Sequence, residues 1–472
     1  MSTAHKRWGW LAAALLAVVI GVVAAACGGS DSSGSSSSAA SSAADTSAAS
    51  SSSGGGTAIK MGFLSNCEGP FGPFWDATLA GYYTALVQFA GAKPVDPKDP
   101  KKGVTGAMVP GTQIPIDLDT NYGCSNDNAD KALAEAKRLV EQDGVNILIG
   151  PLSGDEGIAV ANYAKTQPNV TFFNGISGAQ DTTLKVQAPN FYRFFSDGAQ
   201  WTAGLGAYAY NVLGWRKVAT IGDDYSFPYT QTAGFVAEFC SLGGQITDRI
   251  WPALGETDYS SYIAKLPKDV DGFFLDVGGT GTVQFVKQYT QVNGDTSLVG
   301  KMMGGAFISN PQIIKELGPK VKNVVAGSAL PSDATDATWM AYSDAIKAAY
   351  PDMVANAANI FLAGYYNNTQ AAILGLKAVN GDISNADAFH QAINGVEISS
   401  GVGPVTVDGN RNGVGPNFVV QVTDTGTKTL FTVPDVDQTF GGAFSTSTPS
   451  PDRDNPKCVK GDPPPWAASI TK

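Results

Sequence analysis

The sequence predicts an α/β protein made of two lobes, each built on a doubly wound parallel sheet. From Ala58 onward, short apolar runs alternate with segments of helical periodicity, as expected for strands joined by crossover helices. The apolar runs are continuous, as in NILIG at 146–150, which indicates a sheet that is buried on both faces. The alternation restarts after residues 190–195, and 472 residues are enough for two lobes with a core each.

The first unit begins at Ala58 and alternates strands with helices. We expect strands over 58–64, 113–119, 146–150 and 170–173, and helices over 74–90, 128–144 and 155–166. In the second of these helices Ala132, Ala136 and Val140 share one face, and Gly144 marks the end. Residues 93–112 are rich in Pro and Lys and predict an exposed loop.

The second unit follows the strand-like segment at 190–195. We expect strands over 217–222, 245–250, 272–277, 298–304 and 323–327, and helices over 199–213, 228–242 and 282–291. Three further helices and two strands come next, over 335–349, 357–379, 384–394, 403–407 and 417–422. The tail from about Pro434 is rich in Pro, Gly, Ser and Thr, which indicates an extended strap over the surface that Cys458 could fix.

The N-terminus has the layout of a secretion signal over residues 1–26: a basic head, an apolar run and small residues. A permanent membrane helix needs about 20 apolar residues, and this run is shorter. The sequence AAAC ending at Cys27 resembles the bacterial lipobox, whose cysteine becomes lipidated; a chance cysteine after an ordinary cleavage site is the alternative. Residues 27–57 consist almost entirely of Ser, Gly and Ala and predict a disordered tether. We therefore expect an extracytoplasmic protein, anchored to the outer face of the cell membrane by a lipid on Cys27.

Four cysteines remain besides Cys27, and an even number outside the cytoplasm suggests two disulfides. Three pairings are possible, and we favour Cys67–Cys124 with Cys240–Cys458, because the first two follow the first and second strands of one sheet. Isolated buried thiols are the alternative. No CxxC spacing occurs, so neither a zinc ribbon nor a thioredoxin-like site is indicated.

The composition favours a binding protein over other classes. A net charge of −11 argues against a nucleic-acid partner, which requires a basic face. The only histidines are His5 and His390, too few for a multi-histidine metal site and little material for imidazole catalysis. We expect no enzyme activity, no metal and no cofactor.

The loops after the strands are where a ligand would bind, because open α/β sheets place ligands beyond the carboxyl ends of their strands. These loops carry small, polar and aromatic residues, namely 65–71, 150–154, 174–178 and 222–225. Two lobes that face each other through such loops form a cleft that can close over a small molecule.

The ordered set of segments at these loops resembles the branched-chain amino-acid-binding family, the type I periplasmic substrate-binding proteins of ABC importers. The segments are GPF (69–71), IGPLSG (149–154), NFYRFFSDGAQ (190–200), GDDYSF (222–227), GYYNNTQAAILGL (364–376) and GPVTVDGNRNG (403–413). The resemblance spans about 58–432 and implies a three-strand hinge, with crossings near 189–193, 324–328 and 400–404. It implies lobe 1 over 58–190 plus 327–402, lobe 2 over 191–326 plus 403–432, and a C-terminal strap over 433–472.

The resemblance also implies a set of ligand-binding residues. Ser153 and Ser177, with the amides of Gly154 and Gly178, would hold a carboxylate; Ile176 or Gly178 could take the place of Ser177, because that loop departs from the family pattern. Ser153 also precedes a helix N-terminus, which favours an anion, although it could be a helix cap without a ligand. Tyr225 would contact the ligand after closure, or pack beneath its loop. Phe71 and Phe361 would form apolar walls, although aromatic residues at helical spacing are often only core.

One departure from the family concerns the ligand ammonium. The family commonly binds it with a carboxylate near residues 304–307, where this sequence has Gly-Gly-Ala-Phe. An unpaired buried ammonium would be costly, so an amino-acid ligand needs another acid: Asp276, Asp155 or Glu156. Asp276 could instead bind hydroxyl or amide groups, or cap a loop.

The resemblance implies capture of a small polar organic solute, with amino acids and amides first, and its delivery to an ABC permease by a monomer. One alternative is a ligand-sensing or adhesion lipoprotein of the same fold. A secreted carboxylate-based hydrolase is the enzyme alternative, but GISGA (175–179) is not a G-x-S-x-G motif and His390 lies in an expected helix.

Overall fold

The computed structural model describes residues 57–472. The expected secretion signal, Cys27 and all but the last residue of the tether lie outside the described residues. No helix within 57–472 is long and apolar enough to cross a membrane.

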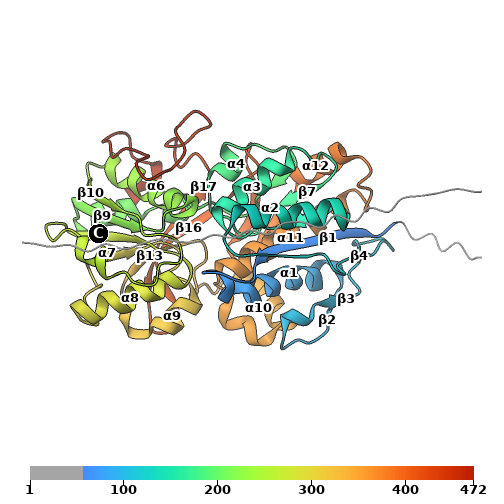
Figure 1. Cartoon of the computed structure of the whole chain (residues 1–472), viewed down its shortest axis with the longest axis horizontal. Helices are drawn as coiled ribbons and strands as arrows, with labels where there is room; N and C mark the ends of the chain where they lie inside the picture. The colour runs from blue at the N-terminus through green and yellow to red at the C-terminus, as the bar shows by residue number, and fades with distance from the viewer. Residues whose placement is uncertain (1–56) are drawn as a thin grey trace, which may run out of the picture. The chain divides into compact units, whose positions relative to one another are not determined.

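The first lobe is built on a parallel six-stranded sheet (Figure 1). Its order is β4-β1-β6-β7-β8, and β5 pairs with β1 beyond β4 on the same edge. The strands are β1 Ile59–Asn66, β4 Ile116–Asp117, β5 Tyr122–Ser125, β6 Ile147–Ile149, β7 Thr171–Phe173 and β8 Phe191–Tyr192. A separate antiparallel pair, β2 Lys93–Pro94 and β3 Val104–Thr105, lies in the segment expected to be a loop.

The second lobe is built on a nine-stranded sheet of order β10-β9-β11-β12-β13-β16-β15-β14, with β17 paired to β16. Its strands are β9 Lys217–Gly222, β10 Gln245–Ile250, β11 Gly272–Asp276, β12 Met302–Gly304, β13 Val325–Ser328, β14 Ile398–Ser400, β15 Gly403–Val407, β16 Gly413–Val422 and β17 Thr427–Val436. The pairs from β10 to β13 are parallel, and those from β13 through β16 to β14 and β17 are antiparallel.

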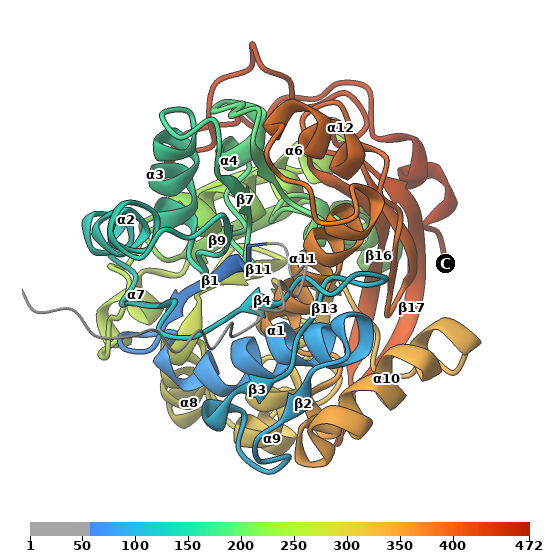
Figure 2. The same cartoon turned by 90° about the vertical axis from the view of Figure 1, so that its right-hand side faces the viewer.

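Helices cover both faces of each sheet. Those of the first lobe are α1 Trp75–Ala90, α2 Ala129–Lys137, α3 Gly154–Ala164, α4 Asp181–Leu184, α10 Ala337–Ala349, α11 Ile360–Ala378 and α12 Ala386–Asn394. Those of the second lobe are α5 Leu205–Ala207, α6 Ser226–Ser241, α7 Ser260–Lys265, α8 Gly279–Asn293 and α9 Pro311–Leu317. In both views α1 and α10 lie on one side of β1, with α2 and α3 on the other (Figures 1 and 2).

The core follows from the alternation of side chains along the central strands. In β6, Ile147 and Ile149 face the layer of α1 and α11, while Leu148 between them faces α2 and α3. In β11, Phe273 packs with Phe285 of α8, and Phe274 stacks on Phe235 of α6. Each sheet is thus buried on both faces, as its continuous apolar strands predict.

The chain passes between the lobes three times: after β8, after β13, and between α12 and β14. This arrangement confirms the predicted α/β fold class with two parallel-sheet lobes joined by three connecting segments.

Several elements differ from the expected ones. The strand expected at 113–119 is divided into β4 and β5, and the helix expected at 199–213 consists of a 3-10 turn (Gln200–Thr202), α5 and a π turn (Tyr208–Leu213). The strand β17 ends at Val436, so its last residues lie in the segment 433–472 that was expected to be an extended strap. It contains Pro434, which an edge strand tolerates because one side of its backbone needs no partner.

Candidate functional site

A small, nearly filled cavity of about 20 Å³ lies between the two lobes. Its lining is almost entirely aromatic or aliphatic, and among the lining residues Ser153 and Tyr225 carry a hydroxyl. The lining residues are Phe71, Leu152, Ser153, Gly154, Ile176, Ile360 and Phe361 from the first lobe, and Trp201, Tyr225, Phe227 and Phe307 from the second. Ligand cavities are typically about 300–1,000 Å³, so this closed arrangement has room for about one water molecule, and a solute requires its walls to move apart.

Five of the residues predicted from the sequence meet in this cavity: Phe71, Ser153, Gly154, Tyr225 and Phe361. Phe71 lies at the centre of an aromatic cluster that joins the lobes, with its ring centroid 6.0 Å from that of Phe361 and 5.7 Å from that of Phe307. Phe71 and Phe361, which were expected to form apolar walls, therefore both line the cavity.

The other three predicted residues do not line the cavity. The Ser177 hydroxyl lies 3.4 Å from that of Thr182, and its neighbour Ile176 takes the place at the lining. Gly178 lies behind the wall, because a Cβ at this position would be 2.5 Å from the Phe227 ring. Asp276 is fully buried behind the second-lobe side and is described below.

The sequence reasoning missed five lining residues: Leu152, Trp201, Phe227, Phe307 and Ile360. Phe227 and Phe307 could have been predicted from the sequence, because each is an aromatic residue a few positions after a parallel strand of the second sheet. Ligands bind beyond the carboxyl ends of such strands. Trp201 lies in the irregular segment after β8, and no local pattern marks it.

Three helices begin at the cavity. The first residues of α3 and α11, Gly154 and Ile360, line it, and so does Tyr225, the residue before α6. A helix N-terminus carries a partial positive charge and free backbone N–H groups. The hydroxyl oxygens of Ser153 and Ser226 are buried there without a hydrogen-bond partner among the described residues. This end of the cavity is suited to an anion.

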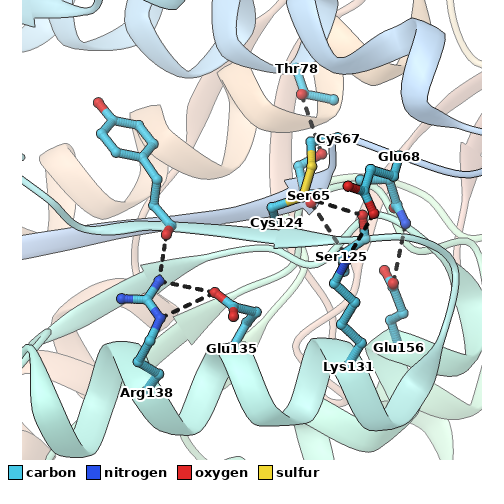
Figure 3. Close-up of a disulfide and its surroundings, with 12 residues drawn as sticks. Ser65, Cys67, Glu68, Thr78, Cys124, Ser125, Lys131, Glu135, Arg138 and Glu156 are labelled. Atoms are coloured by element: carbon cyan, nitrogen blue, oxygen red, sulfur yellow. Dashed lines mark hydrogen bonds and ion pairs between the residues drawn. A yellow bond between two sulfur atoms is a disulfide. The ribbon is translucent and has the colours of Figure 1, made fainter.

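A disulfide fixes the first-lobe loops that border the cavity (Figure 3). Cys67 follows β1, and Cys124 lies in β5 opposite Ser65, so their Cα atoms are 5.4 Å apart. The Glu156 carboxylate, from α3, accepts hydrogen bonds from Asn66 Nδ2 at 3.2 Å and from the Ser153 amide at 3.3 Å. Burial raises the pKa of Glu156 to about 7. The loop after β1 and the start of α3 are thereby held together.

Three further carboxyls lie behind the aromatic wall: Asp127, Asp223 and Asp276. Each has one buried oxygen without a hydrogen-bond partner, and none forms an ion pair with another described residue. Asp127 Oδ2 accepts a 3.4 Å hydrogen bond from the amide of Phe71, and Asp223 Oδ2 accepts one at 2.7 Å from Gly278.

These carboxyls have raised pKa values. Burial, with the charges of Glu156 and Asp223, raises the pKa of Asp127 to about 8. Burial also raises the pKa of Asp223, and burial together with the charge of Asp223 raises that of Asp276. The cause throughout is that a carboxylate is poorly stabilised away from water and near like charges.

The three acids considered for the ammonium differ in their surroundings. Asp155 is exposed and accepts a 3.3 Å hydrogen bond from the amide of Ser226, and Glu156 is engaged with the loop after β1. Asp276 Oδ1 has no hydrogen-bond partner among the described residues. It lies 3.1 Å from the position that a Cβ on Gly305 would take, in the loop that also carries Phe307. Asp276 thus lies beside the segment where the family has its acid.

The two lobes are in direct contact around the cavity. Besides the Ser226–Asp155 bond, the Gln180 amide donates to Thr230 Oγ1 at 3.1 Å and the Thr280 amide donates to the Pro70 carbonyl at 3.1 Å. A Cβ on Gly154 would lie only 2.4 Å from Ser226 Oγ. The structure is therefore a closed arrangement of the lobes.

His390 lies far from this chemistry. It is half-buried on α12, its Nε2 is 3.1 Å from Thr171 Oγ1, and burial lowers its pKa. These contacts belong to the first-lobe core.

Comparison with known proteins identifies the chain's relatives. A model of a periplasmic binding protein family matches residues 58–427, and no curated protein matches the chain. The fold is similar to that of a solute-binding protein of an ABC transporter from R. palustris in complex with benzoate, with a TM-score of 0.70, 20% identity, and coverage of 80% of this chain and 98% of that one.

Two amino-acid-binding proteins are also similar in structure. A leucine-binding protein from Thermotoga maritima has a TM-score of 0.65 at 17% identity and covers 80% of this chain and 99% of its own. A branched-chain amino acid transporter substrate-binding protein from Streptococcus pneumoniae, in complex with isoleucine, has a TM-score of 0.63 at 17% identity, with the same coverage of 80% and 99%. At such identities the likeness shows the fold alone.

Proposed function

The chain belongs to the periplasmic binding protein family, and from that membership we propose that it captures a small organic solute between its lobes and delivers it to an ABC permease. The observation that carries this proposal is the interlobe cavity, whose walls come from both lobes. A solute that contacts both lobes binds the closed arrangement better than an open one, so binding and closure are coupled.

The chemistry of the cavity supports a solute with an anionic group at one end. The N-termini of α3 and α6 meet there, and the free hydroxyls of Ser153 and Ser226 can donate to a carboxylate. The closed lobes leave these hydroxyls without partners, a cost that a bound carboxylate removes.

The carboxyls behind the aromatic wall support a cationic group. Asp223 and Asp276 each keep a buried oxygen unpartnered, and Asp127 does so from the first lobe. Burial raises the pKa values of these carboxyls, and an ammonium there would favour their ionised form and donate to their free oxygens. Its approach requires the rings of Phe71 or Phe307 to shift, because Gly278 beside Asp223 lies against both rings.

The rest of the lining is aromatic and aliphatic, which favours an apolar body for the solute. A zwitterion with an apolar side chain, that is, an apolar amino acid, fits all three parts. An aromatic carboxylate, the kind of ligand held by the R. palustris protein, would use the anionic end and the walls but leave the three acids unpaired.

We further propose that the protein is exported, that a lipid on Cys27 anchors it to the outer face of the membrane, and that it acts there as a monomer without enzyme activity. The signal-like segment and the Ser/Gly/Ala-rich tether support the first two points.

A thermal-shift screen tests the proposal, with L-leucine, L-phenylalanine, benzoate, 4-hydroxybenzoate and glycine as probes. We expect an apolar amino acid to raise the melting temperature and to be recovered unchanged; at a concentration 100 times its Kd a ligand adds about 2.7 kcal/mol to the stability. Ser153→Ala and Tyr225→Ala should each weaken its calorimetric affinity tenfold or more, or about 1.4 kcal/mol.

Gly409→Ala is a matched control, because its Cβ would contact nothing within 4 Å. Chemical change of a probe would support the hydrolase, and affinities unchanged in both site variants would reject the site. Stabilisation by benzoate but not by amino acids would keep the binding function and reject the ammonium subsite.

A further inference from the structure

The C-terminal segment 437–472 extends beyond the part of the chain that the family model matches, which ends at residue 427. It follows β17, the edge strand of the second sheet, and runs over the outside of α6 and β10 (Figure 1, dark red). The structure indicates that it is integrated into the fold rather than a loose tail.

The segment is fixed firmly to the second lobe. Cys458 forms a disulfide with Cys240 near the end of α6, with Cα atoms 5.2 Å apart. Trp466 Nε1 donates at 2.8 Å to the buried carboxylate of Glu238, which also accepts from the amides of Gly204 and Gly206.

The same segment also binds the first lobe. Lys185, the residue after α4, donates from Nζ to the carbonyls of Ser445 at 2.8 Å, Thr446 at 3.0 Å and Thr448. Gln438 Nε2 donates to the Gln180 carbonyl at 3.2 Å. The Lys185 ammonium of the first lobe thus binds three backbone carbonyls of a segment that a disulfide attaches to the second lobe.

A third contact reaches the loop that carries Tyr225. Arg453 donates from Nε to Asp224 at 2.7 Å and also from Nη2 to the same carboxylate, and its carbonyl accepts from Trp251 Nε1 at 3.2 Å. Asp224 directly precedes Tyr225, which lines the cavity. The segment therefore holds the cavity loop of the second lobe from the outside.

We propose that residues 437–472 act as a brace that limits opening of the lobes and positions the Tyr225 loop. Movement of α4 away from the second lobe pulls the Lys185 ammonium from its carbonyls, so these charge-assisted hydrogen bonds oppose opening. The brace acts through residues that do not touch the solute, and its action does not depend on which solute binds.

Hydrogen–deuterium exchange of the full-length protein without any ligand tests this proposal. The reporters are peptides containing the amides of Gln180 and Ser226, which donate across the interface to Thr230 and Asp155. Lys185→Met should raise their exchange rates at least fivefold, because the ammonium is lost while a side chain of similar length remains. Arg453→Gln should raise exchange at Ser226 more than at Gln180.

Lys131→Met is the matched control, because the Lys131 ammonium forms a 3.0 Å ion pair with Glu68 inside the first lobe. Exchange at Gln180 and Ser226 in this variant should equal that of the wild type. Unchanged exchange at Gln180 and Ser226 in Lys185→Met would overturn the brace. So would an equal rise in β1 and β9, because that would indicate loss of global stability. Since no solute is present, the outcome is independent of the proposed binding function.

Discussion

Asp127 connects proton binding to the cavity through its hydrogen bond with the amide of Phe71, which lines the cavity. Its folded pKa of about 8 lies far above that of an exposed aspartate, about 3.9, so between these values the folded state holds a proton that the unfolded state releases. The stability from this group is therefore fully present below about pH 4 and is lost as the pH rises through 8.

Asp127→Asn should reduce this pH dependence. Asparagine keeps the oxygen that accepts from the Phe71 amide, and it tolerates the positive φ of 66° at this position. We expect the free energy of unfolding of the wild type to fall between pH 5 and 8, and the variant to fall less steeply, by up to about 1.4 kcal/mol per pH unit.

Urea unfolding at pH 5, 6.5 and 8 measures this difference. Part of the slope should remain in the variant, since Glu156 also has a raised pKa, of about 7. Identical slopes in the two proteins would show that Asp127 is ionised in the folded state.

The candidate site was predictable residue by residue only where a local pattern fixes the direction of a side chain. Ser153 follows a strand and precedes a helix, so its position at the helix N-terminus is determined by neighbours in the sequence. Ser177 has the same kind of loop, but its hydroxyl packs against Thr182 and beneath α3, where Gly157 makes room for it. Which of two adjacent residues faces a cavity depends on such tertiary packing, and spacing does not encode it.

At the scale of elements, closure depends on how near the N-termini of α3 and α6 can come. Gly154 has ordinary helical backbone geometry, so alanine there is tolerated within the first lobe. Its Cβ, however, would lie 2.4 Å from Ser226 Oγ and 2.9 Å from the Phe227 nitrogen of the opposite lobe.

Gly154→Ala should therefore impair closure without unfolding either lobe. We expect at least a tenfold loss of calorimetric affinity for the solute found in the screen, and a melting temperature of the ligand-free protein within about 2 °C of wild type. Gly409→Ala should change neither quantity. Wild-type affinity in Gly154→Ala would mean that the helices need not meet for binding.

Elements were predictable where the apolar period is strong, and less so where the backbone is irregular or exposed. Central strands such as β9, Lys217–Gly222, agree with their expected bounds because their burial dictates a continuous apolar run. The strand β17 exposes much of one face and contains Pro434, and both features are typical of a loop. Only its pairing with β16 makes it a strand, and that pairing is a property of the folded sheet.

At the scale of the whole molecule, the closed arrangement without a solute has a cost. The hydroxyls of Ser153 and Ser226 and the free oxygens of Asp223 and Asp276 are buried without partners within residues 57–472, and each such group typically costs about 1–3 kcal/mol. Water can reach these groups when the lobes separate, so the free protein should populate more open arrangements in solution.

Small-angle X-ray scattering should accordingly show a smaller radius of gyration when the stabilising solute is added to the wild type. The decrease should be absent in Gly154→Ala, because that variant cannot bring its helices together. A radius that is the same with and without solute in the wild type would indicate that the lobes are rigidly joined, contrary to a capture mechanism.

The bridge between Cys240 and Cys458 spans 218 residues and ends near the last residue of the 472. During synthesis or export, with the N-terminus leading, Cys240 emerges long before its partner. Both lobes can be complete before Cys458 is available, so the cross-link forms only after residue 458 has been synthesised. A chain cut short before residue 458 would leave the Cys240 thiol unpaired and α6 without its covalent link to the C-terminal segment.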